Sequence, residues 1–292
     1  MADTIVCAVD QSEAAEPVFD TARWLADELG ARLSVVHVAD GPVRDADELL
    51  ASIRSQLGGG SIDIQLLEGS PARAIIDAAD HAAAELLVVG SRGRGSLRAA
   101  VLGSVSRELT AQASCPVVVV PSGSDANPGA AAPGAQASVV CGIDGSDQAL
   151  AAVAIAGRLA SRLHCRLVAV HARQNIRAMV SYPGARSSTP PVTGQEDSVG
   201  QLTDEIVQRA VAAAGGNASG VIEPGPPAQV LESVAQREGA RLIVVAARGL
   251  GALRSALLGS VAAELTTSAS CPVMVLSESA LAGASPTRMD QP

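Results

Sequence analysis

The chain contains the same ordered set of segments twice, and this internal repeat limits the possible folds more than any other feature. TIVCAVDQS (4–12) returns as SVVCGIDGS (138–146), and GSRGRGSLRAAVLGS (90–104) returns as AARGLGALRSALLGS (246–260). Two copies of one sequence pattern fold in the same way, and the 292 residues are enough for two domains of roughly 130–150 residues each. The repeat therefore predicts two tandem domains.

The spacing of equivalent residues locates an insertion in the second copy. Asp10 and Asp144 are 134 residues apart, whereas Cys115 and Cys271 are 156 apart, so the second copy carries 22 extra residues. The insertion and the segment between the copies are rich in Gly, Pro, Ala, Ser and Thr, which gives them little to bury. We expect a first domain over 1–122, a linker over 123–136, a second domain over 137–278 and a flexible tail over 279–292.

Each copy alternates short β-branched runs with longer helical stretches. The runs are apolar on both faces, which is typical of strands in a parallel sheet covered by helices on both sides. Such a pattern predicts α/β domains, each with a doubly wound, Rossmann-like, five-stranded parallel sheet, and a ligand site beyond the carboxyl ends of the strands. In the first copy the expected strands are 5–9, 32–38, 62–67, 85–90 and 116–121, and the expected helices are 13–29, about 44–57, 71–83 and 104–113.

The composition excludes several classes of function. A net charge of −9 argues against electrostatic binding to nucleic acid or an anionic membrane, and three aromatic residues cannot build a base-stacking surface. All 21 basic residues are arginine, which removes a lysine-dependent phosphate loop and Schiff-base chemistry. No apolar run reaches the ~20 residues of a membrane span and no signal peptide is recognisable, so we expect a cytoplasmic protein.

The remaining candidates for chemistry favour structural roles. His37 and His171 lie inside expected strands, and Ser146 lacks the surroundings of a hydrolase nucleophile. The cysteines are odd in number, lack a C-x-x-C motif and mostly sit in or beside Val-rich runs, as expected for small buried apolar residues. We expect no catalytic residues and no metal-ligating cluster. The cysteines are Cys7, Cys115, Cys141, Cys165 and Cys271.

The glycine-rich stretch at 90–104 is the strongest candidate for a binding site. Gly90 and Gly93 allow the backbone to turn tightly and approach a ligand, and Gly103 with Ser104 opens a helix whose free N–H groups attract an anion. Arg92, Arg94 and Arg98 add positive charge. The stretch is consistent with a phosphate-binding loop without lysine. The alternative is that the glycines are turn residues, Ser104 is a helix cap and the arginines are solvated.

The pattern Gly90-x2-Gly93-x9-Gly103-Ser104 resembles the nucleotide-binding signature of the universal stress protein family. The resemblance extends to VDQS at the end of the first strand, G-x-P at 69–71 and the closing CPVVVV, and it covers both copies. It implies ATP binding, with Mg²⁺ as an optional companion. By this resemblance, the ribose or adenine is held by Asp10, the adenine pocket is lined by Val38, the ribose and phosphates are surrounded by Gly90, Gly93, Gly103 and Ser104, and Arg92 assists.

The second copy keeps only part of this signature. Ala246 stands in the place of Gly90, Ala172 in the place of Val38 and Leu250 in the place of Arg94. A methyl group at position 246 is expected to crowd the path of a ligand. The nucleotide-binding positions that the second copy retains are Asp144, Gly249, Gly259 and Ser260.

Three functions remain open from the sequence. The resemblance implies an ATP-binding protein with a regulatory or stress-response role and little or no turnover, whose domains pack as an internal pseudo-dimer and act on a protein partner that the sequence does not identify; further homodimerisation stays open. A slow ATPase would depend on Asp10. A nucleotide-free interaction module would have a degenerate second pocket, dock its partner around 174–200, and use the strand runs at 117–120 and 273–276 as interface edges.

Overall fold

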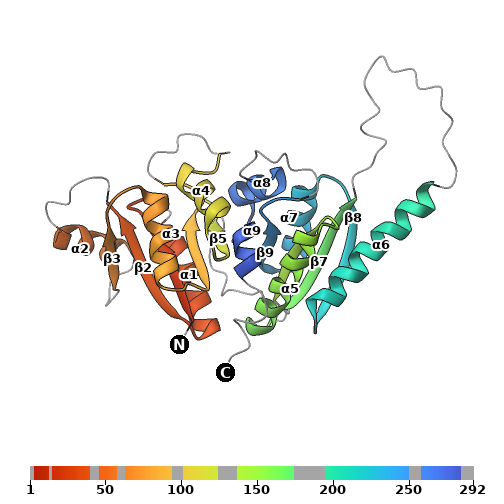
Figure 1. Cartoon of the computed structure of the whole chain (residues 1–292), viewed down its shortest axis with the longest axis horizontal. Helices are drawn as coiled ribbons and strands as arrows, with labels where there is room; N and C mark the ends of the chain where they lie inside the picture. The colour runs from red at the N-terminus through yellow and green to blue at the C-terminus, as the bar shows by residue number, and fades with distance from the viewer. Residues whose placement is uncertain are drawn as a thin grey trace, which may run out of the picture.

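The fold is described from a computed structural model, which places residues 3–12, 15–39, 46–57, 63–93, 101–123, 137–173, 195–249 and 258–283. Their strands form one ten-stranded sheet in the order β3-β2-β1-β4-β5-β10-β9-β6-β7-β8. The first five strands come from the first copy of the repeat, here called the first half, and the other five come from the second half. The molecule is elongated, and the two halves lie side by side along its longest axis (Figure 1).

The first half has the predicted alternation of strands and helices. Its strands run in parallel and pair in the order β3-β2-β1-β4-β5, so the chain reverses its direction of travel across the sheet between β1 and β4. The elements are β1 (Thr4–Ala8), α1 (Ala15–Leu29), β2 (Arg32–Val38), α2 (Ala46–Gln56), β3 (Ile64–Leu67), α3 (Pro71–His81), β4 (Leu86–Gly90), α4 (Ser104–Gln112) and β5 (Val117–Val120).

The second half repeats this topology with the strand order β8-β7-β6-β9-β10. Its helix α6 is the longest described helix and ends the molecule at the right of Figure 1. The elements are β6 (Ser138–Ile143), α5 (Asp147–Arg162), β7 (Arg166–Arg173), α6 (Gln195–Ala214), β8 (Ala218–Pro224), α7 (Pro227–Arg237), β9 (Ala240–Ala246), α8 (Ser260–Ser268), β10 (Val273–Leu276) and α9 (Glu278–Gly283).

Helices cover both faces of the sheet, because alternate strand residues point to opposite sides and both sides are apolar. On one face, residues of α1, α2 and α5 pack into a single buried cluster that spans both halves, with Leu25, Ile53 and Leu159 among its members. On the other face, α3 and α4 bury a cluster of the first half, and α7 and α8 bury a separate cluster of the second half. The predicted doubly wound α/β fold is therefore confirmed in both halves.

The two halves meet at β5 and β10, which pair antiparallel. Val118 pairs with Met274 at the centre of this contact, and both side chains are fully buried. Ser277, just after β10, donates a hydrogen bond of 2.8 Å from its Oγ to the carbonyl of Ala113 in the first half. The interaction-module hypothesis treated these two strand runs as interface edges, and in this structure they pair with each other.

The C-terminal segment differs from the expectation of a flexible tail from residue 279. Residues 278–283 form α9, and Ala280 is buried. The Ser277 Oγ accepts a hydrogen bond of 2.9 Å from the Ala280 N–H and so anchors the start of this helix. The sequence-based expectation was wrong for residues 279–283, because a six-residue helix is too short to be stable alone and depends on packing against α5 and β10. The linker residues 124–136, the inserted residues 174–194 and the C-terminal residues 284–292 lie outside the described ranges.

The cysteines have the structural role that the sequence predicts. All five are free and buried. Burial raises the pKa of the Cys115 and Cys141 thiols to about 12, which keeps them protonated and unreactive at neutral pH.

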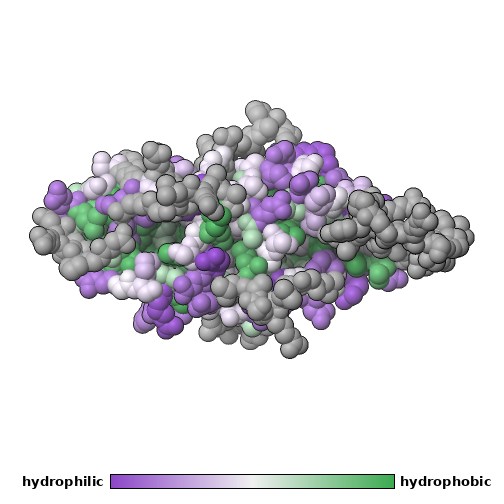
Figure 2. All heavy atoms as spheres, turned by 90° about the horizontal axis from the view of Figure 1, so that it is seen from above, coloured by the Kyte–Doolittle hydropathy of each residue, from purple (hydrophilic) through white to green (hydrophobic). Residues whose placement is uncertain are grey.

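The surface of the described residues, seen from above, carries hydrophilic side chains with apolar patches between them (Figure 2). None of the helices in the described ranges is long and apolar enough to span a bilayer.

Candidate functional site

A cavity of about 470 Å³ lies in the first half beyond the carboxyl ends of the neighbouring strands β1 and β4, between which the strand order reverses. This is the switch point at which doubly wound sheets bind ligands, because the loops after neighbouring strands there turn to opposite faces. The cavity is lined by all seven residues that the resemblance assigns to nucleotide binding in this half, although they come from four separate parts of the chain. They are Asp10, Val38, Gly90, Arg92, Gly93, Gly103 and Ser104.

Asp10, two residues beyond the end of β1, is held in a fixed orientation. Its Oδ1 accepts hydrogen bonds from the N–H of Ser12 at 3.0 Å and from the Ser12 hydroxyl at 2.5 Å. A Cβ added at Gly93 would lie 2.5 Å from the other oxygen, Oδ2. Gly93 is therefore required by close contact with the carboxylate. The loop has glycine at this position because the Asp10 carboxylate occupies the space that a side chain would need.

The loop after β4 returns to the sheet at the start of α4. The Gly103 N–H donates a 2.9 Å hydrogen bond to the carbonyl of Ser91, and the Ser106 hydroxyl donates a 2.6 Å bond to the carbonyl of Gly90. These two bonds place the first turn of α4 at the rim of the cavity. The N–H groups at the start of a helix lack acceptors within the helix and carry the positive end of its dipole, so this rim favours a negatively charged group.

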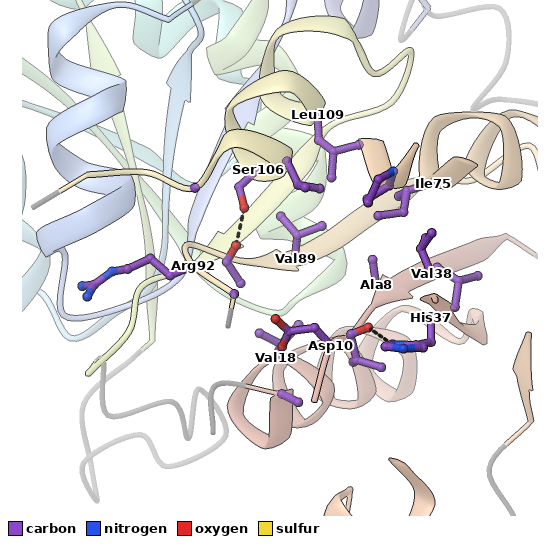
Figure 3. Close-up of a pocket in the computed structure, with 18 of the residues that line it drawn as sticks. Ala8, Asp10, Val18, His37, Val38, Ile75, Val89, Arg92, Ser106 and Leu109 are labelled. Atoms are coloured by element: carbon purple, nitrogen blue, oxygen red, sulfur yellow. Dashed lines mark hydrogen bonds between the residues drawn. The ribbon is translucent and has the colours of Figure 1, made fainter. Parts of the chain in front are cut away.

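The opposite part of the cavity is apolar (Figure 3). Val38 at the end of β2, Val89 in β4, and Ile75 in α3 face the hollow together with Leu109 in α4. His37 also lines it, and its Nδ1 donates to the carbonyl of Val9 at 2.8 Å, as predicted for a strand histidine with a structural partner. The cavity thus combines an apolar wall suited to a flat ring system with a polar, anion-attracting rim.

The assistance of Arg92 to a bound nucleotide stays a prediction. Arg92 lines the cavity, but its side chain points away from His37 and Ile75 (Figure 3), and its Nε is buried without a hydrogen-bond partner among the described residues. Arg94 and Arg98 lie outside the described ranges. The polar groups that the structure directs at the rim are therefore the start of α4 and the Asp10 carboxylate.

The second half has an equivalent cavity of about 420 Å³ between β6 and β9, lined by Asp144, Gly249, Gly259 and Ser260. Asp144 repeats the geometry of Asp10, since its Oδ1 accepts from the Ser146 N–H at 3.0 Å and from the Ser146 hydroxyl at 2.6 Å. A Cβ at Gly249 would overlap the Asp144 carboxylate. Ser146 also caps α5, because its Oγ accepts from the Ala149 N–H at 3.1 Å.

Ala246 lines this second cavity, and its surroundings differ from those of Gly90. A Cβ added at Gly90 would lie 3.3 Å from Cγ2 of Val18 in α1. The residue of α5 at the equivalent position, by the 134-residue spacing, is Ala152, which lacks that methyl group. A smaller neighbour on the helix therefore leaves room for the larger residue on the strand, while the expected crowding of a ligand by Ala246 stays a prediction.

Several lining residues were not found from the sequence. Ser106 fixes the loop to α4, and Ile75 and Leu109 form the apolar wall. Helical periodicity shows that such residues face inward but cannot show which of them border a cavity. For Ser106 the sequence does contain a signal, because the equivalent residue of the second copy is Ala262. The hydroxyl group at this position is therefore present in the first copy and absent from the second.

The surface groove beside β2, β3 and α3, within the described residues, lacks this convergence. It is more open, has a volume of about 650 Å³, and has Arg32, Asp63, Asp77 and His81 among its residues. Asp77 is already paired with Arg73, and its backbone carbonyl accepts from His81, so these groups satisfy each other. Across the described residues, no three His, Cys, Asp or Glu side chains come together to hold a metal ion.

Comparisons with known proteins agree with the fold and the repeat. The model of the universal stress protein family matches residues 1–52, 44–121 and 137–277. Universal stress protein Rv2005c of Mycobacterium tuberculosis is 34% identical over 220 residues, which cover 75% of this chain and 70% of that protein. Universal stress protein Rv2623 of the same organism is 30% identical over 249 residues, covering 83% of this chain and 76% of that protein.

A solved structure extends the comparison to the whole tandem arrangement. The crystal structure of a universal stress protein from Archaeoglobus fulgidus DSM 4304 is similar with a TM-score of 0.61, covering 94% of this chain and 98% of that one. At 19% identity this likeness concerns the fold alone. From the family match in both halves and the sequence relatives along most of its length, this chain belongs to the universal stress protein family.

Proposed function

We propose that this protein binds ATP in the cavity of the first half and acts as a regulatory nucleotide-binding protein in a stress response, with little or no turnover. The observation that carries the proposal is the convergence of Asp10, Val38 and the glycine-rich loop on one cavity of about 470 Å³. That volume lies within the range of roughly 300–1,000 Å³ usual for small-molecule sites. The choice of ATP among adenine nucleotides rests on the family resemblance.

The geometry supports a definite orientation of the nucleotide. The apolar wall formed by Val38, Ile75 and Leu109 suits the adenine ring. The start of α4, at Gly103 and Ser104, suits the phosphates, because the N–H groups of the first turn lack acceptors within the helix and no side chain caps them. The ribose would then lie nearest to Asp10, whose carboxylate accepts hydrogen bonds from hydroxyl groups.

The site favours binding over hydrolysis. Asp10 is the one carboxylate among the described residues that line the first cavity, and its Oδ1 already accepts two hydrogen bonds from Ser12. His37 commits its Nδ1 to the Val9 carbonyl. The chain contains no lysine to neutralise charge on a transferred phosphoryl group. A slow ATPase would have to act through these constrained groups, so we favour a role for ATP as a ligand.

The second cavity supports a second, weaker site. It keeps the aspartate, the glycines and the serine, and Ala152 leaves room for Ala246. Ala172 in place of Val38 offers a smaller apolar surface to the base. Arg248 is drawn toward α9 by an ion pair with Glu278 at 3.4 Å, which reduces its availability to a phosphate.

We also propose that the halves, with boundaries near residues 122 and 137, work as an internal pseudo-dimer in the cytoplasm. The antiparallel pairing of β5 with β10 supports this arrangement.

The first experiment measures bound nucleotide directly. The full chain is purified without added nucleotide and denatured, and the supernatant is separated by anion exchange against nucleotide standards. We expect about one ATP per chain from the first cavity, and a value approaching two where the second cavity is also filled. Added ATP with Mg²⁺ at about 100 times its Kd should raise Tm by roughly 5–10 °C.

Two matched variants assign the sites. Ser104→Glu places a carboxylate at the start of α4, and Ser260→Glu does the same at α8. An acidic residue in the first turn interacts favourably with the helix dipole and stabilises the helix, so each variant should stay folded while its charge repels the phosphates. We expect Ser104→Glu to remove most of the bound ATP and Ser260→Glu to remove the smaller fraction; each is the control for the other. Absence of nucleotide together with no change in Tm on adding ATP and Mg²⁺ would refute the proposal and favour the nucleotide-free interaction module.

A further inference from the structure

The junction between the halves contains a second set of contacts beside the β5–β10 pair, on the face covered by α1 and α5. Arg162, the last residue of α5, pairs with Glu85 just before β4 and lies 3.2 Å from the Asp3 carboxylate. Its guanidinium also donates to the carbonyl of Leu29 at the end of α1, at 3.3 Å. One arginine of the second half thus contacts three separate parts of the first half.

A second arginine makes the reciprocal contact. Arg241 in β9 lies 3.8 Å from the carboxylate of Glu28 in α1, and its guanidinium is stacked over the ring of Trp24 at 5.8 Å from the centroid. In each pair one side chain is largely buried and its partner is partly exposed: Glu85 and Arg241 are 11% and 17% exposed, whereas Arg162 and Glu28 are each 35% exposed. The charges are therefore screened less than those of a fully exposed ion pair.

The repeat shows that these contacts use equivalent positions with reversed charge. With the spacing of 134 residues, Glu28 of α1 corresponds to Arg162 of α5. With the spacing of 156 residues, Glu85 before β4 corresponds to Arg241 in β9. The first half therefore has glutamate at both positions and the second half has arginine at both. In the junction, the position at the end of the helix in one half faces the position at the start of the strand in the other half, as Glu28 with Arg241 and Arg162 with Glu85.

The central strands cannot by themselves distinguish one half from the other. The runs VVVV in β5 and VMVL in β10 are both fully buried and apolar. An antiparallel pair of two β5 strands, or of two β10 strands, would satisfy the same backbone hydrogen bonds. Selection between like and unlike halves must therefore come from the side chains around the strands.

We propose that the reversed charges make this surface specific for unlike halves, so that the first half pairs with the second half and rejects another first half. Two first halves in this arrangement would place Glu28 of each against Glu85 of the other, and two second halves would place Arg162 against Arg241. Like charges in a partly buried contact are strongly unfavourable, whereas the unlike pairing places each arginine against a carboxylate. The partner that this surface fits is a domain with basic residues at the two equivalent positions, which the same chain supplies. The inference is independent of nucleotide binding.

Single charge reversals in the full chain test this specificity. Glu85→Arg leaves two arginines facing each other within the chain, and it makes the first half self-complementary, because the new arginine matches Glu28 of another copy. Arg162→Glu does the same for the second half through Arg241. We expect each variant to lower Tm, on the order of 5 °C, and to form a concentration-dependent species of twice the wild-type mass in light scattering.

The double variant Glu85→Arg/Arg162→Glu distinguishes charge pairing from a general loss of packing. It restores an opposite-charge pair within the chain, and the tethered partner has the higher effective concentration, so we expect wild-type mass and most of the lost Tm to return. Fluorescence of Trp24, the only tryptophan, provides a local readout of the junction.

The matched control is Glu238→Arg, which breaks the Arg166–Glu238 ion pair inside the second half, a pair that contributes no ion pair to the first half. It should lower Tm without changing the mass. The proposal is overturned if the two single reversals keep the wild-type mass, if the double variant fails to recover, or if Glu238→Arg forms the same larger species.

Discussion

At the scale of single residues, the glycines of the binding loop are explained by contacts. Among the described residues, Gly90, Gly93 and Gly103 are absent from the set with positive φ, so left-handed backbone geometry is not their reason. Gly93 lies against the Asp10 carboxylate, and Gly103 lies against the carbonyl of Ser91. A Cβ at Gly93 would overlap a group of the same site, and one at Gly103 would make a tight contact of 3.3 Å.

Gly93→Ala tests this contact. The added methyl group would meet the Asp10 carboxylate at 2.5 Å, so either Asp10 leaves its hydrogen bonds with Ser12 or the loop moves. We expect a loss of about 1–3 kcal/mol in the free energy of unfolding, measured by urea denaturation. Because Asp10 contributes the atoms nearest to the added group, the same substitution in an Asp10→Ala background should cost much less. An equal cost in both backgrounds would show that the contact is unimportant.

At the scale of elements, one glycine permits the close packing of α5 against the end of α6. Gly157 lies inside α5, and a Cβ there would overlap the carbonyl of Ala214 at the end of α6. Glycine ordinarily lowers the stability of a helix, so Gly157 costs some stability of α5 and in return allows the end of α6 to pack closely against it. In the first half Arg23 is the equivalent residue and is exposed, which indicates that the requirement is specific to the second half.

Gly157→Ala and Gly200→Ala should have opposite effects on thermal stability. Gly200 also lies within a helix, α6, but a Cβ there has no neighbour within 4 Å. We expect Gly200→Ala to stabilise the protein by about 0.5–1 kcal/mol through helix propensity alone. Gly157→Ala should destabilise it, by about 1–3 kcal/mol, because a backbone carbonyl cannot move aside easily. The comparison is made by calorimetry, and stabilisation by both substitutions would contradict the packing argument.

At the scale of the whole molecule, the two halves share one sheet and the buried cluster on one of its faces. The buried cluster beneath α1 and α5 contains residues of both halves, including Leu25 and Leu159. The β5–β10 contact lies at the centre of the ten-stranded sheet, so separation of the halves would expose two apolar strand edges. The repeat is therefore a duplication in sequence that produces one structural unit.

We expect this unit to unfold in a single cooperative transition. In guanidinium, the fluorescence of Trp24 at the junction and the far-UV circular dichroism of the entire chain should change with the same midpoint. The calorimetric and van't Hoff enthalpies should then agree. Charge reversal at Glu85 should separate the two probes, because it weakens the junction selectively. Two well-resolved transitions in the wild-type protein would show that the halves are independently stable.

Much of this structure was predictable from the sequence for physical reasons that act locally. Val- and Ile-rich runs such as IVCAV and VVVV specify strands that are buried on both faces, and Pro71 sets the start of α3. The ordered landmarks after each strand indicated the cavity, because parallel strands bring their carboxyl ends to one edge. The expectation failed at α9, whose helix depends on contacts with distant residues.

The sequence by itself determined the duplication and the doubly wound fold of each half, since these follow from periodicity and from the order of elements along the chain. Its resemblance to a known family indicated most of the residues at the rim of the cavity. The tertiary structure alone decided which side chains form the apolar wall, why Gly93 lies against Asp10, and that Glu85 meets Arg162 across the junction. These are contacts between residues far apart in the chain. Their geometry depends on how packed elements face one another, which local sequence preferences do not encode.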